Sequence, residues 1–513
     1  MANTSLWGRT CLILLLTAAI GHAETDRGLL LLQKRYREAA TDFRGSMHEL
    51  ANFCEANSYF SDAEELRKRA EPAAQQTLDI DELPDTVVPE LRVNLPPLEL
   101  QWRARQRKLE HDHALTLYKL SRDALHQGHV SFAFQLMREV AFHDPDHKFA
   151  RSALGFVRLG DEWTTPYSAT MTRKGNVDHP TFGWLPKAHV PRYEQGERNV
   201  QGKWISAERE AAIRSDFRYA WEIPTEHFFI KTNHSLEQGV QIGRELEEFH
   251  KFFVREYAAF FNTPQQMQRL FDKGEAASST PGKRYTVYYF RNKDDFVKHL
   301  ISDQPNIAIT NGLYLPRNRI AYFYHQDQGD EANSETMFHE VTHQLLGESS
   351  SRTIDAGANA NFWVVEGIAC YMESYRRNGK HVETGMPGHP RFYWARERLI
   401  TEQEYYSFPS FTALGMQQFQ GAGDVATLQK YYAQAATMCH FFLNYREGLY
   451  RDAFLTYLAQ VYSPSDRVRL ATKPLDELTE VGFPTLEQQY REYVATLSPT
   501  PQPVSIQANE QAP

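Results

Sequence analysis

The stretch Met337–Glu348, with the sequence MFHEVTHQLLGE, constrains this chain more than any other. Residues four apart in an α-helix point in the same direction, so a helix here aims the imidazoles of His339 and His343 at one point, with Glu340 one step round the helix. Two imidazoles and a carboxylate suit Zn²⁺, and a catalytic zinc site keeps its fourth position open for water. An ordinary amphipathic helix with two unrelated histidines could have the same sequence. A third ligand therefore decides between a metal site and an ordinary helix.

A candidate third ligand follows 23 residues after the second histidine, in the stretch Asn361–Ser374, NFWVVEGIACYMES. Glu366 is the acidic residue of an otherwise apolar run, and a carboxylate is costly to bury unless something neutralises its charge. Zinc would neutralise it, whereas an exposed glutamate on an amphipathic helix would need no partner. Gly367 and Ala369 are small residues that allow helices to approach closely. We therefore predict that Glu366 completes a zinc site with the two histidines.

The pattern H-E-x-x-H followed by W-x-x-E-G-x-A-x-Y resembles the gluzincin metallopeptidases, in particular the peptidase MA-like group. The resemblance covers roughly residues 220–490, and its specific part lies in residues 339–375. It implies that the two histidines and Glu366 bind zinc, and that Glu340 is the general base of a metal-assisted peptide hydrolysis. It also implies a catalytic domain with a mixed β-sheet in its upper half and helices in its lower half.

The resemblance also implies a place for the substrate. Members of the family lay substrate backbone along an edge strand that precedes the motif helix, and the segment Thr310–Leu315, with Gly312 and Tyr314, fits that place. Strand addition of this kind uses main-chain hydrogen bonds. Half of an ordinary hairpin is the alternative interpretation. The segment lacks the glutamate of the G-x-M-E-N signature of one-zinc aminopeptidases, which puts aminopeptidase activity in doubt.

Other site residues follow from the resemblance, with two departures. Many gluzincins supply a tyrosine or histidine from a later helix to stabilise the oxyanion; Tyr432 is the candidate here, and Tyr431 and His440 are its competitors. In thermolysin-like gluzincins an aspartate four residues after the glutamate ligand orients the first histidine. That place is taken by Cys370, which cannot accept the hydrogen bond in the same way. Glu373, one turn further, is the candidate to reach a ligand histidine instead.

The N-terminus has the pattern of a secretory signal peptide over residues 1–23. Arg9 precedes an apolar run from Cys11 to Ile20, and Ala23 ends a small-x-small cleavage pattern. We therefore expect a secreted protein, periplasmic or extracellular, with no membrane span in the mature chain. The net charge of −9 and the absence of a basic run from the sequence argue against nucleic-acid binding.

Hydrophobic periodicity and composition predict an α+β protein in several parts. The predicted parts after the leader are a helical region at 24–160, a Trp-containing β-rich segment at 161–215, a metallopeptidase-like catalytic domain at 216–497 and a disordered tail at 498–513. The helical region contains one hairpin with tetratricopeptide-like spacing, at Leu117, Leu120, Ala124, Ala133 and Pro145. One such unit cannot form a solenoid, so a helical hairpin packed on its neighbours is the favoured interpretation.

Three local patterns carry further expectations. The tryptophans of the β-rich segment either line a binding surface or anchor short strands; they are Trp163, Trp184 and Trp204. The cysteines that remain after the leader either include a Cys370–Cys439 bridge or are buried free thiols, Cys54 among them. The acidic segment His325–Glu335 predicts a solvated loop, and Asn333 or Ser334 is expected to cap the motif helix, which Gly347 ends.

The favoured hypothesis is a secreted, zinc-dependent peptidase that acts on a peptide or protein substrate. The helical region would be accessory and available to a protein partner. A binding protein that uses this region, with a structural or vestigial zinc site, is the alternative from another class. A third hypothesis is a zinc hydrolase that acts on another amide, such as a cell-wall peptide. Zinc content measured together with peptide hydrolysis separates the first two.

Overall fold

The computed structural model describes residues 7–71, 83–92, 94–274, 284–326, 330–350, 352–378 and 381–497. Side chains of residues 7–27, 330–333, 378 and 381 are outside this description. The predicted disordered tail also lies outside it, as does the predicted signal peptide apart from the helical backbone that begins at Trp7. The described chain is a mixed α+β protein, so the predicted fold class is confirmed.

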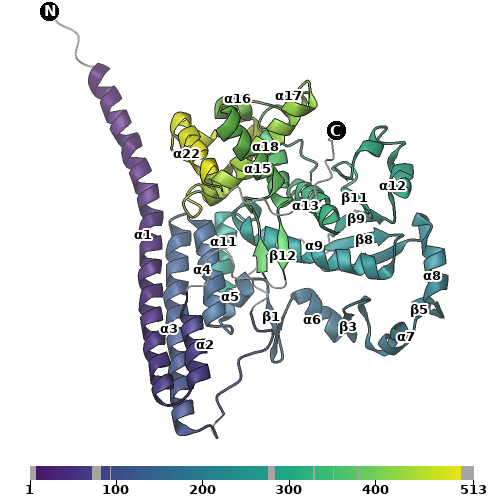
Figure 1. Ribbon diagram of the computed structural model, residues 1–513, viewed down its shortest axis with the longest axis horizontal. Helices are drawn as coiled ribbons and strands as arrows, with labels where there is room; N and C mark the ends of the chain where they lie inside the picture. Colours follow the sequence, from purple (N-terminus) through teal and green to yellow (C-terminus); the bar gives the residue numbers. More distant parts are fainter. Residues whose placement is uncertain are drawn as a thin grey trace, which may run out of the picture.

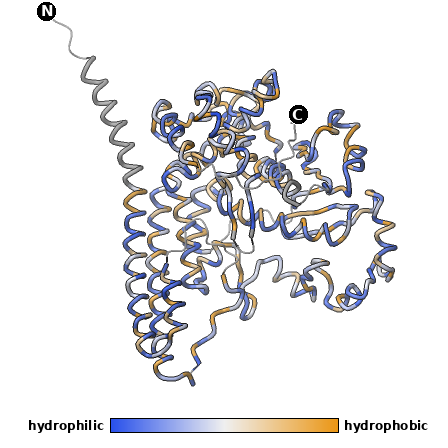
Figure 2. The backbone as a smooth tube through the Cα atoms, viewed as in Figure 1, coloured by the Kyte–Doolittle hydropathy of each residue, from blue (hydrophilic) through white to orange (hydrophobic). Residues whose placement is uncertain are grey.

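The N-terminal region is a helical bundle along one side of the molecule (Figure 1). Its helices are α1 (Trp7–Ala56), α2 (Phe60–Ala70), α3 (Pro97–His126), α4 (Val130–His143) and α5 (Lys148–Ala153). Polar and apolar residues alternate along these helices (Figure 2), which is the pattern of amphipathic helices that share a core. The α3–α4 hairpin turns at Gly128, whose φ of +86° favours glycine. The residues with tetratricopeptide-like spacing that are buried in this hairpin are Leu117, Leu120, Ala124 and Ala133.

A strap of three hairpin–helix units follows the bundle and runs along α9 (Leu236–Glu256) (Figure 1). Its elements are β1 (Val157–Leu159), β2 (Glu162–Thr164), α6 (Pro166–Arg173), β3 (Asn176–His179), β4 (Gly183–Pro186), η2 (Lys187–His189), α7 (Val190–Glu194), β5 (Glu197–Val200), β6 (Lys203–Ser206) and α8 (Ala207–Arg214). The predicted β-rich segment therefore alternates hairpins with helices, and its first hairpin begins before residue 161.

The strap tryptophans act as anchors for the hairpins. Trp163 is buried, and its Nε1 donates to Asp146 Oδ1 at 2.8 Å. Trp184 and Trp204 are half-buried and meet a tyrosine of the preceding helix edge-on, Tyr167 and Tyr193 respectively, with ring centroids 6.1 Å apart in both pairs. Each hairpin is thus fixed by an aromatic contact. This geometry favours the anchoring interpretation over an exposed binding surface.

A five-stranded mixed sheet forms the centre of the described residues. Its order is β10-β11-β9-β8-β7, with antiparallel pairs at both edges and parallel pairs inside. The strands are β7 (Trp221–Pro224), β8 (Phe228–Thr232), β9 (Tyr285–Phe290), β10 (Gly312–Leu315) and β11 (Ile320–Tyr324). One face contributes Val287, Ala321 and Phe323 to a core shared with α9 and the motif helix. The other face packs on α12 (Lys293–Leu300) through Phe296 and Tyr322.

The short elements η3 (Phe217–Tyr219) and η4 (Ile307–Ile309) lie near the sheet, and α10 (Ala258–Phe261) follows α9. The helix α11 (Pro264–Lys273) packs on the bundle, since Met267, Leu270 and Phe271 belong to the bundle core. At the start of α9, Ser235 Oγ accepts from the Gln238 N–H.

A helical half completes the fold. Its elements are α13 (Asp330–Gly347), α14 (Phe362–Met372), β12 (Arg376–Asn378), β13 (His381–Glu383), α15 (Pro390–Glu397), the π-helix η5 (Arg398–Glu402), α16 (Phe408–Thr412), α17 (Met416–Gln420), α18 (Val425–Asn444), α19 (Arg451–Val461), α20 (Asp466–Leu470), α21 (Leu475–Leu478) and α22 (Phe483–Thr496). The predicted cap at Asn333 or Ser334 is wrong, because α13 begins at Asp330. The second part of the acidic segment is therefore helical; acidic residues in a first turn complement the helix dipole.

Two further structural expectations are resolved in the described part of the chain. The thiols of Cys54, Cys370 and Cys439 are buried and free, so the free-thiol alternative holds. None of the helices there combines the length and the apolar character that a bilayer crossing requires.

Candidate functional site

The motif helix α13 lies close against the edge strand β10. A methyl group on Gly312 would lie 2.7 Å from Cγ2 of Thr336, so only glycine allows this approach. Tyr314 also packs against the helix, since its hydroxyl oxygen would lie 3.6 Å from a methyl group on Gly347. The side chain of Tyr314 is therefore buried beneath α13 and is not part of an open pocket.

The three predicted ligands converge. His343 Nε2 lies 3.2 Å from His339 Nε2, and Glu366 Oε2 lies 3.6 Å from His339 Nε2 and 3.7 Å from His343 Nε2. Four ligands placed about 2.0–2.1 Å from a zinc ion lie about 3.3–3.4 Å from one another. The observed separations are close to the edges of that tetrahedron, so these residues fit a zinc ion.

Glu366 reaches the histidines because α14 is packed on all sides. Every residue of α14 is buried, and Glu366 is 7% exposed. A methyl group on Gly367 would lie 2.6 Å from the carbonyl oxygen of Ala435, so this glycine allows α14 and α18 to touch. The close contact between the two helices brings α18 beside the site.

The electrostatics of the cluster favour a bound cation. Burial raises the pKa of Glu366, but His343 and His339 outweigh it and hold that pKa well below its usual range. Burial lowers the pKa of His339, but its contacts with Cys370, Glu366 and Glu373 raise it well above its usual value. Two imidazole nitrogens 3.2 Å apart require either a proton or a cation between them. The negative surroundings supply the charge that a divalent cation needs.

Glu373 lies behind the first histidine and is itself held by an arginine. His339 Nδ1 lies 2.9 Å from Glu373 Oε1, so the carboxylate fixes the ring proton on Nδ1 and leaves Nε2 for a metal. Arg391 of α15 donates to both oxygens of Glu373, at 2.9 and 3.0 Å. Cys370, which takes the place of the aspartate, also lies against His339. The sequence offered no local signal for Arg391, because its partner lies on another helix.

The carboxylate of Glu340 faces the edge strand. Its Oε2 accepts a hydrogen bond of 2.8 Å from the Tyr314 N–H. Because the Tyr314 N–H bonds to Glu340, the backbone polar groups of Tyr314 point away from β11. In an antiparallel pair the N–H and C=O of alternate residues point to the same side, so those of Gly312 also point away from β11. The Tyr314 N–H is thus occupied by Glu340, and Gly312, whose N–H and C=O share this direction, is a buried residue.

Tyr432 on α18 is the aromatic residue that lies beside the cluster. Burial, Glu366, Cys370 and Glu340 raise its pKa well above the usual value, so its hydroxyl stays protonated. Within the described residues this hydroxyl has no hydrogen-bond partner, and Arg391 lies 5.5 Å from its ring centre.

The two competitors of Tyr432 belong to the core. Tyr431 packs in an aromatic group whose members are Tyr406, Phe411 and Phe419. His440 is satisfied by the Gly385 carbonyl at 2.7 Å and the Tyr493 hydroxyl at 2.8 Å. His440 is therefore buried and fully bonded, whereas Tyr431 is half-buried with its ring held in the aromatic group.

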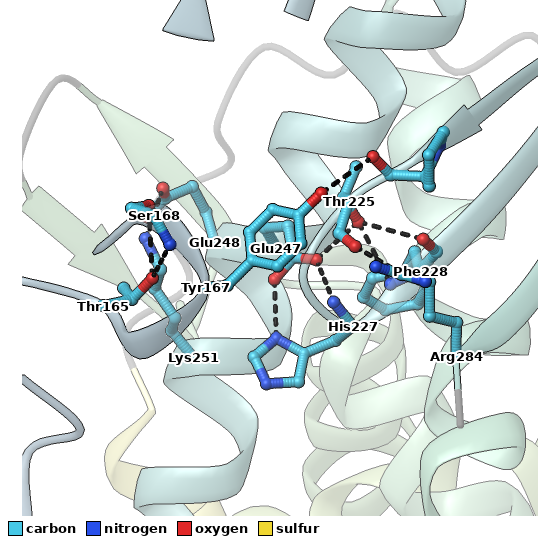
Figure 3. Close-up of polar contacts among 11 residues, drawn as sticks. Thr165, Tyr167, Ser168, Thr225, His227, Phe228, Glu247, Glu248, Lys251 and Arg284 are labelled. Carbon is cyan, nitrogen blue, oxygen red and sulfur yellow. Dashed lines mark hydrogen bonds and ion pairs between the residues drawn. The ribbon is translucent and has the colours of Figure 1, made fainter. Parts of the chain in front are cut away.

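Another histidine cluster lies at the turn between β7 and β8 (Figure 3). Glu247 of α9 accepts from the Thr225 hydroxyl and the His227 N–H, both at 2.5 Å, and its second oxygen lies 2.7 Å from His227 Nδ1. The rings of His227 and His250 are stacked, with centroids 3.9 Å apart and planes 23° apart. One donor atom of each of His227, Glu247 and His250 lies within 4.8 Å of the others, but both Glu247 oxygens are already bonded to the turn, so this cluster fastens the turn to α9.

The arrangement around α13 therefore combines three converging metal donors, a carboxylate beside the edge strand β10 and a protonated phenol. Such a set suits hydrolysis of a polarised carbonyl group. No protein-family model matches this chain, and no curated protein matches it at a significant level.

Proposed function

We propose that this chain is a zinc-dependent peptidase of the gluzincin type. The observation that carries the proposal is the convergence of His339, His343 and Glu366, with ligand separations of 3.2, 3.6 and 3.7 Å. A structural zinc site has no need of a base, whereas here Glu340 lies on the same helix beside a strand edge. A secreted location and the gluzincin architecture of the domain belong to the same proposal.

His339, His343 and Glu366 would hold the ion. When bound, zinc supplies a Lewis acid that polarises a carbonyl group and acidifies water. Glu340 accepts the proton of the attacking water and passes it to the leaving nitrogen. Its hydrogen bond to the Tyr314 N–H fixes one carboxylate oxygen, so the other is available for proton transfer.

The substrate main chain would extend the sheet at β10. The N–H and C=O of Gly312 point away from β11 and would supply the ladder hydrogen bonds once a substrate strand pairs with this buried edge. Tyr432 donates its hydroxyl proton toward the oxyanion that develops on the substrate carbonyl. Glu373 and Arg391 act through His339, because they fix its tautomer and orientation.

The test is a Glu340→Gln variant of the full chain. We expect about one zinc ion to stay at this site while hydrolysis of a peptide library falls by about 10²–10⁴-fold, the usual contribution of a general base. Glu49→Gln, an exposed change on α1, is the matched control and keeps full activity. Zinc is measured by mass spectrometry and cleavage by product analysis, which also identifies the bond that is cut.

Two outcomes contradict the proposal. Retained hydrolysis in Glu340→Gln removes the assigned base. Zinc bound at this site in wild-type protein without hydrolysis of any peptide favours the alternative, a binding protein with a structural or vestigial zinc site.

A further inference from the structure

A second group of metal-type ligands lies inside the helical bundle. It consists of His113 on α3 and of Glu139 and His143, one helical turn apart on α4. One donor atom of each residue lies within 4.8 Å of a donor atom of the other two. The three side chains are 7%, 4% and 6% exposed. This group is separate from the site on α13 and α14, and nothing in the proposed peptidase mechanism uses it.

The cluster contains polar groups whose burial is not compensated. In the described part of the chain no lysine or arginine pairs with Glu139, whose one hydrogen bond comes from the Tyr36 hydroxyl at 3.1 Å. His143 Nδ1 is fully buried and has no hydrogen-bond partner among the described residues. Burial raises the pKa of Glu139 to about 7 and lowers that of His113 to about 4. An uncompensated carboxylate and two neutral imidazoles are costly in an apolar core.

The two rings meet as the ligand rings of the α13 site do. The His113 and His143 centroids are 4.7 Å apart and their planes differ by 82°; the His339 and His343 centroids are 4.9 Å apart and their planes differ by 75°. Phe43 of α1 stacks on His113 at 4.3 Å and closes the cluster from one side. Among the described residues the cluster is enclosed by helices α1, α3 and α4, so an ion there would be structural.

We propose that His113, Glu139 and His143 bind a second zinc ion that ties α3 to α4 beneath α1. Two imidazoles and a carboxylate suit zinc among the late first-row dications. The donor atoms lie within 4.8 Å of one another, so small side-chain rotations that move them by about an ångström bring them to tetrahedral spacing. The ion neutralises Glu139 and supplies a partner for an imidazole nitrogen, which removes the cost of burying them.

The test measures zinc per chain in the full-length protein after dialysis against Zn²⁺-free buffer. We expect about two equivalents in wild type, about one in Glu139→Gln, about one in His343→Ala and none in the double variant. Glu139→Gln keeps the shape of the side chain and an oxygen that accepts from Tyr36, so it isolates the charge. His129→Gln, a buried histidine at the start of α4 outside the cluster, is the control and keeps both ions.

Thermal unfolding gives a second readout with opposite signs for the two interpretations. If zinc is bound, Glu139→Gln lowers the Tm of the zinc-loaded protein, and a chelator abolishes the difference. If the cluster is only a hydrogen-bonded core, removal of a buried carboxylate leaves the Tm unchanged or raises it. Unchanged zinc content in Glu139→Gln, or a Tm in zinc that is unchanged or raised, overturns this inference. If the wild type binds one zinc ion that is lost in His343→Ala but kept in Glu139→Gln, this inference is overturned and the peptidase proposal stands. If that ion is kept in His343→Ala but lost in Glu139→Gln, this inference stands and the zinc site of the peptidase proposal is overturned.

Discussion

Two clusters of two histidines and one glutamate, one with half-buried histidines and one buried throughout, differ in what surrounds them. The cluster on α13 and α14 has a glutamate behind its first histidine and another facing the edge strand, Glu373 and Glu340. The cluster on α3 and α4 has one carboxylate, Glu139, and an aromatic wall formed by Phe43. The ring geometry is nearly the same in both. Both clusters thus have the same kinds of donor, whereas the neighbouring edge strand, the carboxylate of Glu340 and the Glu373–Arg391 pair belong, among the described residues, to the α13 cluster alone.

This difference distinguishes the residues that metal binding requires from the further residues that catalysis requires. A metal is held when buried donors converge. Catalysis also needs a route for substrate, a group that takes a proton and a support that keeps each ligand in one tautomer. The proposed function assigns the proton acceptor to Glu340 and the support to Glu373, and the bundle cluster has no counterpart of either carboxylate among the described residues.

The largest effect is expected from paired glutamine variants of the two ligand carboxylates. Glu366→Gln removes the ligand charge and the metal, so hydrolysis falls by about a thousandfold or more, as the loss of several kcal/mol of metal catalysis requires. Glu139→Gln changes kcat/KM by less than about twofold, because the clusters act independently. Steady-state kinetics on a cleaved peptide measures both. Equal losses in the two variants would contradict the separation of roles.

The next effect is expected from Tyr432→Phe. Loss of one oxyanion donor costs about 10²–10³-fold in kcat, with little change in KM. Tyr431→Phe is the matched control on the same helix and should keep its activity, because that ring packs in the core. A loss in the control that equals the loss in Tyr432→Phe would show that the effect comes from packing.

A smaller effect is expected from Arg391→Gln. Glu373 would lose its bidentate partner, and zinc affinity or activity should fall by about 10–100-fold, as is usual when an outer support of a ligand is removed. Competition with a zinc chelator measures the affinity. Arg396→Gln on the same helix is the control. Unchanged affinity and activity in Arg391→Gln would remove this arginine from the site.

The smallest effect on catalysis is expected from Glu256→Gln, a change where the helical bundle meets α9 and α19. Glu256 of α9 pairs with Arg138 of the bundle and with Arg451 of α19, the latter at 2.8 Å. Burial raises the pKa of Glu256, but the two arginines outweigh it and lower that pKa to about 2.

A depressed folded-state pKa stabilises the protein above the unfolded value near pH 4.5, and this stability is lost as the pH falls toward 2. Glu256→Gln should therefore destabilise the fold at pH 7 by at most about 3 kcal/mol, and by less at pH 3. Urea unfolding at the two values tests the sign. A difference from wild type that grows in acid would contradict the assignment.

Much of the α13 site could be predicted because its signals are local. Helical spacing gave the direction of His339 and His343, and a charge inside an apolar run pointed to Glu366. The edge strand at Gly312 was expected from the family resemblance, and the sheet places it at an edge. The hydrogen bond from the Tyr314 N–H to Glu340 depends on the register of the strand and could not be predicted from the sequence.

The remainder depends on contacts between distant segments. Arg391 meets Glu373 only after the chain has passed through β12 and β13, so no spacing indicates it. His113 and Glu139 lie on different helices, and the one-turn spacing of Glu139 and His143 was the sole local signal of their cluster. The start of α13 was misplaced because acidic residues suit both a loop and a first helical turn.

The most direct measurement is anomalous X-ray scattering at the zinc edge from crystals of the full chain. The account predicts a peak bounded by His339 Nε2, His343 Nε2 and Glu366 Oε2, with about 2.0–2.2 Å to each atom. A zinc-saturated crystal without a peak there, or with Glu366 turned away from the two rings, would contradict the account.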